Sequence, residues 1–178
     1  EQAHEKECLT MNKKQKTMLA RILAAAALLV ALDQLVKYLV VQNIPLGEYL
    51  PFLPHILDLT YVQNTGAAFS LFSEHTWLLT LISLVMSVLL LMALVRGFFR
   101  HPFGRISLAL LLAGAVGNLI DRAFQGYVVD MFHVLFMEFA VFNVADICVV
   151  VGGIAAAVYY MWGYERLEKG LHPQEHRS

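Results

Sequence analysis

Ionisable residues are scarce in this sequence. Only 15% of its 178 residues are Asp, Glu, Lys or Arg, whereas 58% are hydrophobic. A soluble domain carries about a quarter charged residues, and disordered chains are richer still in polar and charged residues. The shortage is also concentrated, because the stretch from Trp77 to Val95 contains no ionisable residue at all. The composition therefore argues against a soluble globule, a disordered chain and a nucleic-acid binder.

Cysteine pairs, histidine pairs and phosphate-binding loops are missing as well. Cys8 and Cys148 lie far apart in unlike surroundings, which excludes a disulfide framework and a Cys/His metal spacing. The seven histidines show no HExxH-type pairing, and no glycine-rich phosphate loop is present. His133 and Glu138 lie in an apolar stretch, Met131 to Val141, which fits an interfacial segment better than a metal site. We therefore expect neither a metal nor a cofactor.

Four hydrophobic stretches each approach the roughly 20 residues that a helix needs to cross a bilayer. They run from Met18 to Val41, His75 to Val95, Ile106 to Ile120 and Val141 to Tyr164. The first stretch has the basic leader of a signal peptide, but it is too long and lacks a clear cleavage site, so we favour an uncleaved span. The sequence predicts an all-α integral membrane protein, with one domain at 18–164 between polar cytoplasmic tails at 1–17 and 165–178.

Lys and Arg residues fall on one side of these spans. Eleven of the 13 precede or open the first span, lie between the second and third, or follow the fourth; the exceptions are Lys37 and Arg122. The positive-inside rule then places both termini in the cytoplasm, with residues 42–74 and 121–140 outside. Within the first outer segment, the stretch from Ile56 to Val62 is rich in β-formers, which predicts a small β-like element at the outer bilayer surface.

Charged residues at membrane depth gather near the outer ends of the spans. Asp33 and Lys37 are four positions apart, so they can pair on one helical face. Asp121 can pair with its neighbour Arg122. Because a carboxylate in apolar surroundings needs a partner, the simplest interpretation of both pairs is structural.

Small and polar residues near these charges have two interpretations. Gly114 favours close packing between helices. Asn118 and Asn143 either bridge helices by hydrogen bonds or contact a substrate. Ser83 and Ser87 are expected to hydrogen-bond within their own helix.

Asp130 and Asp146 differ from the other carboxylates because neither has a cationic neighbour at helical spacing. If the loop between them folds back, the two carboxyl groups meet, and one of them keeps a proton. One Asp can then activate water, while the other hydrogen-bonds to a scissile carbonyl and protonates the leaving amine. Spacing alone leaves ion or proton transport and a non-catalytic assembly role open, although transport predicts a polar stripe through the bilayer that this sequence lacks.

Five short motifs in order resemble the lipoprotein signal peptidase, or signal peptidase II, family. They are DQLVK at 33–37, NTGAAFS at 64–70, GAVGNLIDR at 114–122, VVD at 128–130 and FNVAD at 142–146. The sequence departs from the family pattern at Ala113 and Met131, where the family often has Gly and Phe. The segment between Asp130 and Asp146 is also compact for the family, so we expect the lid over the site to differ in detail.

The resemblance implies an aspartic endopeptidase of the bacterial cytoplasmic membrane, with its active site at the extracytoplasmic face and no cofactor. Its substrate would be a diacylglyceryl-modified prolipoprotein, cut just before the lipidated lipobox Cys, and its other partner membrane lipid. We expect a monomer, because one chain supplies the whole site, and no nucleic-acid partner.

The resemblance also implies roles for individual residues. Asp130 and Asp146 would form the catalytic dyad. Four residues would bind the substrate or hold the dyad: Asn64, Asn118, Arg122 and Asn143. Five others would support the site: Asp33, Lys37, Gly114, Asp121 and Ala145.

Overall fold

The computed structural model describes residues 13–66, 76–99 and 101–168 of the chain. It contains four helices that are long and apolar enough to cross a membrane. They are α2 (Lys13–Asn43), α3 (Thr76–Val95), α4 (Pro102–Gln125) and α5 (Val144–Val158), which continues into the π-helical η2 (Tyr159–Glu168). Helix α4 is the central one, because 56% of its most apolar 18-residue stretch is buried inside the protein. The corresponding share is 11% for α2 and for α3.

The four predicted spans are confirmed as helices, but their ends differ. Helix α4 runs past Asp121 to Gln125, because Gly126 adopts a left-handed conformation (φ 78°) and donates its N–H to the Arg122 carbonyl. At the other end, Pro102 starts the helix and the His101 side chain accepts the Phe103 N–H. The fourth span was predicted to begin at about Val141; its helix begins at Val144, because Asn143 caps α5.

A three-stranded antiparallel sheet joins the two outer segments. Strand β2 (Leu57–Asn64) lies between β1 (Tyr49–Leu53) and β3 (Val128–Val134). The expected β-like element is confirmed by β2, whereas β3 was not predicted and includes part of the stretch expected to be interfacial. Strand β1 contains Pro51, which an edge strand tolerates, because among the described residues one side of its backbone has no partner strand.

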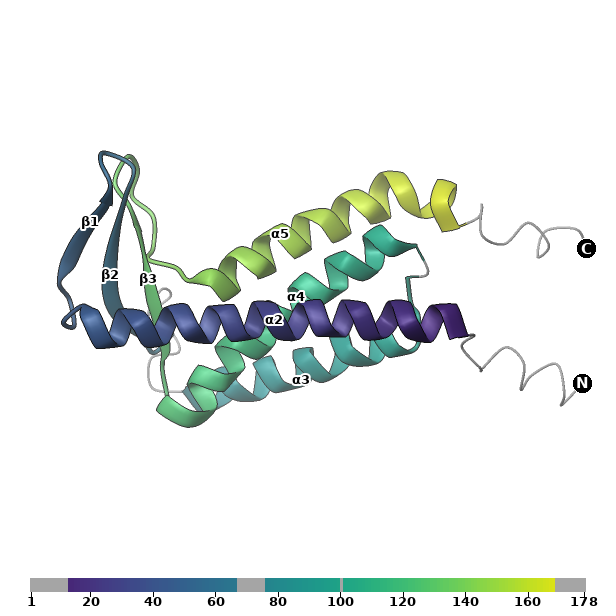
Figure 1. Cartoon of the computed structure of the whole chain (residues 1–178), viewed down its shortest axis with the longest axis horizontal. Coiled ribbons are helices and arrows are strands. Elements are labelled where there is room, and N and C mark those ends of the chain that lie inside the picture. Colours follow the sequence, from purple (N-terminus) through teal and green to yellow (C-terminus); the bar gives the residue numbers. More distant parts are fainter. Residues whose placement is uncertain (1–12, 67–75, 100, 169–178) are drawn as a thin grey trace, which may run out of the picture.

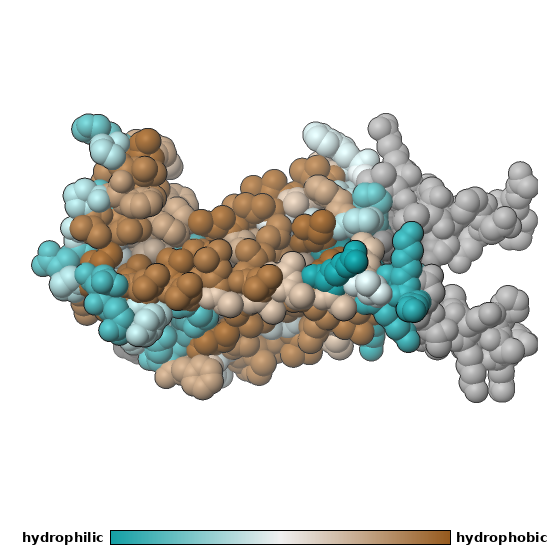
Figure 2. All heavy atoms as spheres, in the orientation of Figure 1, coloured by the Kyte–Doolittle hydropathy of each residue, from teal (hydrophilic) through white to brown (hydrophobic). Residues whose placement is uncertain are grey.

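The sheet lies at one end of the helices, and the start of α2 and the end of η2 lie at the other (Figure 1). At the sheet end, Val40 and Ile44 of α2 pack with Tyr61, Val129 and Met131. At the opposite end, a second core packs α2, α3, α4 and η2 together through Ile22, Ala26, Leu94, Phe99, Leu108, Ala109, Leu112, Ala113 and Tyr159. The outer surface of the helices is apolar between polar ends (Figure 2), as expected of a lipid-facing surface.

Close contact between α4 and α5 fixes the position of the sheet end of the bundle. A Cβ on Gly114 would collide with the carbonyl oxygen of Ala145 and approach a Val149 methyl group to 2.6 Å. A Cβ on Gly117 would come within 2.7 Å of Asp33 Oδ2. Glycine is therefore required on this face of α4 for α2 and α5 to approach as closely as they do.

Candidate active site

Asp130 and Asp146 come together where β3 meets the first turn of α5. Asp130 lies on β3, opposite Val62 of β2, and only 2% of its surface is exposed. Asp146 lies in the first turn of α5 and is partly exposed. One side chain, Asn143, hydrogen-bonds to both residues. The two residues that the sequence predicted to meet are therefore connected through Asn143 in the structure.

Two asparagine amides hold the Asp130 carboxyl group. Asn64 Nδ2 donates to Oδ2 at 2.8 Å, and Asn143 Nδ2 donates to Oδ1 at 2.6 Å. Asn64 is itself oriented, because its Oδ1 accepts the Gly66 N–H at 2.7 Å. Burial raises the pKa of Asp130 from its ordinary value of 3.8 to about 6, and the nearby charge of Asp146 adds to this rise. The two amide hydrogen bonds lower the pKa, but their effect is smaller than that of burial.

Asp146 is held by groups that donate to its carboxylate. Asn118 Nδ2 donates to Oδ1 at 2.8 Å, and the Asn143 backbone N–H donates to Oδ2 at 3.1 Å. In return, Asn143 Oδ1 accepts the Asp146 N–H at 2.9 Å, which completes a reciprocal cap at the start of α5. Asp146 is partly exposed, whereas Asp130 is almost completely buried, so the two aspartates occupy different environments.

Two further carboxylates near Asp130 and Asp146 form ion pairs with Lys37. Its Nζ lies 2.8 Å from Asp33 Oδ2 and 2.9 Å from Asp121 Oδ2, and it donates to Asn118 Oδ1 at 3.1 Å. All three charged side chains are almost completely buried. The pairing expected between Asp33 and Lys37 is confirmed. The pairing expected between Asp121 and Arg122 was wrong, because α4 directs Asp121 toward α2.

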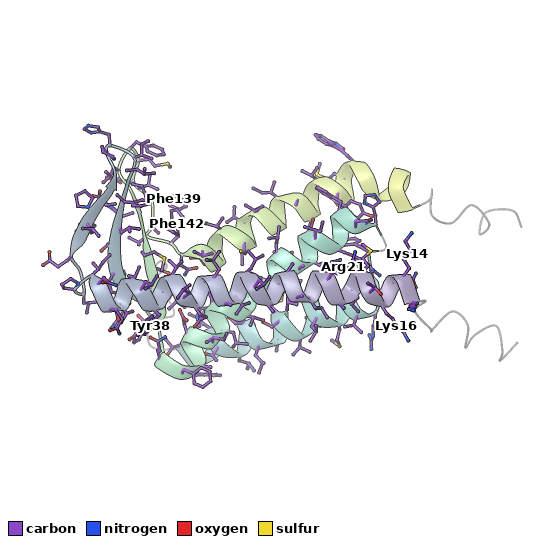
Figure 3. All side chains as sticks on the ribbon, viewed as in Figure 1. Lys14, Lys16, Arg21, Tyr38, Phe139 and Phe142 are labelled. Carbon is purple, nitrogen blue, oxygen red and sulfur yellow. The ribbon has the colours of Figure 1, made fainter. Side chains whose placement is uncertain are left out.

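An apolar cavity of about 450 Å³ lies beside Asp146 and Asn64. Phe139 and Phe142 contact each other edge to face, with ring centroids 5.8 Å apart, between the sheet and the start of α5 (Figure 3). The other lining residues are Ala140, Val141, Ile147, Val150 and Val151. Ile147, Val150 and Val151 are exposed on α5, so the cavity borders the apolar outer face of that helix beside Asp146.

Comparison with known proteins identifies the family. The family model for signal peptidase (SPase) II matches residues 25–162. The chain belongs to the signal peptidase II family. It is 43% identical over 145 residues to the lipoprotein signal peptidase of Enterococcus faecalis, covering 82% of this chain and 90% of that protein. It is 46% identical over 127 residues to that of Streptococcus pneumoniae, covering 71% of this chain and 83% of that protein.

Two solved structures of bacterial membrane enzymes share this fold. A bacterial membrane enzyme determined by the in meso method at 2.3 Å resolution matches with a TM-score of 0.74 and 26% identity, covering 89% of this chain and 94% of that one. A second such structure, at 1.9 Å resolution, matches with a TM-score of 0.75 and 27% identity, covering 81% of this chain and 94% of that one. The chain is thus a multi-pass membrane protein of the signal peptidase II family.

Several residues of this signal peptidase II chain have partners that the sequence did not predict. Arg122 Nη1 donates to Ser83 Oγ on α3 at 3.3 Å, and Ser83 thus links two helices. Ser87 behaves as expected and donates to the Ser83 carbonyl. Gln34 donates to Asp33 and Asp121, a role that sequence reasoning missed. The sequence did contain an indication of this role, because a neutral amide such as that of Gln34 needs hydrogen-bond partners at membrane depth.

Two other sequence expectations concern this site. Residues 67–70 of the predicted NTGAAFS motif lie outside the described residues, whereas Asn64 lies at the end of β2. Among the described residues of this signal peptidase, no three His, Cys, Asp or Glu side chains are grouped to hold a metal ion. His133 contacts Tyr49 at the sheet, with 5.1 Å between the ring centroids.

Proposed function

We propose that this chain is an aspartic endopeptidase that removes the signal peptide from diacylglyceryl-modified prolipoproteins, cutting before the lipidated lipobox Cys. Membership of the signal peptidase II family supports signal-peptide removal from prolipoproteins. The observation that carries the aspartic mechanism is the pair Asp130 and Asp146, linked through Asn143 and bordered by an apolar cavity. Two carboxyl groups in unlike environments are the components that this chemistry needs.

In the proposed mechanism, Asp146 is the general base and Asp130 carries the proton. Burial favours the protonated form of Asp130, whereas Asp146 is the more exposed of the two residues. Asp146 accepts a proton from water, and the resulting hydroxide bonds to the scissile carbonyl carbon. Asp130 hydrogen-bonds to the carbonyl oxygen, and its proton passes to the leaving amine as the C–N bond breaks. The pair then again holds one proton, now on Asp146.

The remaining site residues have supporting roles in this proposal. Asn64, Asn118 and Asn143 hold the dyad through the hydrogen bonds described above. We assign Arg122 to binding of the substrate backbone, since its guanidinium has more donors than the bond to Ser83 uses. Gly114 and Ala145 set the approach of α4 to α5.

The proposed setting is the bacterial cytoplasmic membrane, with the dyad at the extracytoplasmic face. Lys14, Lys16 and Arg21 lie at the end of α2 away from the sheet (Figure 3), which supports a cytoplasmic N-terminus under the positive-inside rule. The acyl chains of the substrate then occupy the outer leaflet, and its scissile bond lies at the interface. Residues 18–164 form a single monomeric peptidase domain, with cytoplasmic tails at 1–17 and 165–178.

A cleavage assay with purified protein and a diacylglyceryl-modified lipobox peptide tests this function. We expect turnover that survives EDTA and falls at least a thousandfold in both Asp130→Asn and Asp146→Asn. Asp58→Asn, at a β2 position opposite His133, is the matched control and should retain activity. Turnover by either dyad variant would overturn the aspartic mechanism, and equal cleavage of the unlipidated peptide would overturn the lipid requirement.

A further inference from the structure

The two carboxylates that pair with Lys37 each make a second contact, and both contacts lead to the dyad. Asp33 Oδ1 accepts the backbone N–H of Ala145 at 2.8 Å. Asp121 Oδ2 accepts the backbone N–H of Val129 at 3.1 Å. Ala145 immediately precedes Asp146, and Val129 immediately precedes Asp130. Each buried carboxylate is thus bonded to the peptide next to one dyad residue.

Lys37 and Gln34 tie these two carboxylates together. Lys37 has three N–H donors, and its three acceptors are Asp33, Asp121 and Asn118. Gln34 Nε2 lies 3.2 Å from Asp33 Oδ2 and 2.9 Å from Asp121 Oδ1. It also donates to the Gly117 carbonyl of α4 at 3.2 Å. Helix α2 therefore links the backbone of α5 to the backbone of β3 through charged and amide side chains.

Stability alone is a weak reason for such a cluster. Removing charges from water is costly, and well-packed apolar residues often stabilise a buried site as much as an ion pair does. Catalysis gives a stronger reason, because small errors in the placement of reacting groups reduce rates by large factors. The coupling between two nearby carboxyl groups also depends on their separation.

We propose that Asp33, Gln34, Lys37 and Asp121 form a brace that fixes the separation of Asp130 and Asp146. These four are positioning residues, since they act on the dyad through the Ala145 and Val129 peptides and through Asn118. Of the four, Gln34 is the one that the sequence did not single out. The inference rests on the proposed function, because it takes Asp130 and Asp146 as the reacting pair.

The kinetic test uses Gln34→Leu, Asp33→Asn and Asp121→Asn, together with the double variant Asp33→Asn/Asp121→Asn, in the full chain. We expect kcat to fall at least tenfold in each Asp variant while KM changes less than about threefold. The apparent pKa values of the kcat/KM profile should move closer together, because a looser dyad is less strongly coupled. The double variant should lose little more than the worse single variant, since both belong to one unit.

Gln34→Leu keeps the test decisive if a charge variant fails to fold, because it removes the link without leaving a charge unpaired. A merely structural role would lower the thermal stability but leave the pH profile of the remaining activity unchanged. Brace variants that fold and show the wild-type kcat and pH profile would overturn the inference. Asp58→Asn is again the matched carboxylate control.

Hydrogen exchange separates failure of the brace from failure of the proposed function. Exchange at the Val129 and Ala145 amides requires no turnover. Both N–H groups should be protected in the wild type and exposed in Asp121→Ala and Asp33→Ala respectively, because alanine removes the accepting oxygen. Unchanged protection in both variants would overturn the brace even if the dyad is catalytic. Activity in Asp130→Asn or Asp146→Asn would instead overturn the aspartic mechanism.

Discussion

At the scale of single residues, three asparagines determine how the dyad is held. Asn64 and Asn143 donate to Asp130, while Asn118 donates to Asp146. An amide can donate to a carboxylate without adding a charge, so it lowers the pKa less than a neighbouring Lys or Arg would. Neutral donors therefore let burial keep the pKa of Asp130 near 6.

The raised pKa of Asp130 predicts a pH dependence for both stability and activity. Because its pKa is higher in the folded protein than the ordinary value of 3.8, its contribution to stability is complete below about pH 4 and is lost as pH rises through about 6. As Asp130 loses its proton, kcat/KM of the free enzyme should fall about tenfold per pH unit above that value. A pH series of thermal unfolding, with Asp130→Asn as the insensitive reference, measures the first effect.

Replacing Asn64 shifts this pH dependence in a defined direction. Asn64→Leu removes one donor to the ionised form of Asp130, so the pKa should rise and the alkaline limb of kcat/KM should move to higher pH. Gln63→Leu, which alters the neighbouring exposed amide, is the control. A limb that stays in place in Asn64→Leu would contradict the role given to this hydrogen bond.

At the scale of the elements, the first turn of α5 combines a helix cap with one residue of the proposed catalytic dyad. Asn143 accepts the Asp146 N–H as the cap and also donates to Asp130. Serine caps helices about as well as asparagine but is too short to reach Asp130. We therefore expect Asn143→Ser to keep nearly wild-type thermal stability while kcat falls at least a hundredfold. Asn143→Ala should lose the activity and about 1 kcal/mol of stability as well.

The contact between α4 and α5 gives a second prediction at this scale. Gly114→Ala places a methyl group against the Ala145 carbonyl, which separates the helices beside Asp146 and should lower both thermal stability and kcat. Gly153→Ala is the matched control, because its Cβ meets only a Leu111 methyl at 4.0 Å and alanine favours the helix. Equal effects of the two substitutions would contradict the importance of this contact.

At the scale of the whole molecule, the orientation in the membrane is open to direct measurement. With Cys148→Ser, a membrane-impermeant thiol reagent should label Cys8 only from the cytoplasmic side. Glu48→Cys, placed at the exposed start of the sheet in a chain lacking the other cysteines, should be labelled only from outside. Labelling of Cys8 in intact cells would reverse the proposed topology.

Much of the architecture was predictable because it depends on local composition. A run of apolar residues must form a helix in a bilayer, since no water is available to its backbone, and all four spans were found in this way. Strand β3 was missed because its partner, β2, is remote in the sequence. The β2–β3 register joins Leu57 to Val134, and nothing in the local pattern of either segment specifies this pairing.

The sequence by itself determined that this chain has four helices able to cross a membrane and that its polar residues lie near one end of them, because hydropathy and helical spacing are local properties. Only the tertiary structure decided that Asn143 joins Asp130 to Asp146 and that Lys37 pairs with Asp121. These contacts link separate elements, and they depend on how closely α2 and α5 pack on the glycine face of α4. Such packing is set by side chains from several elements at once, so no single segment of the sequence encodes it.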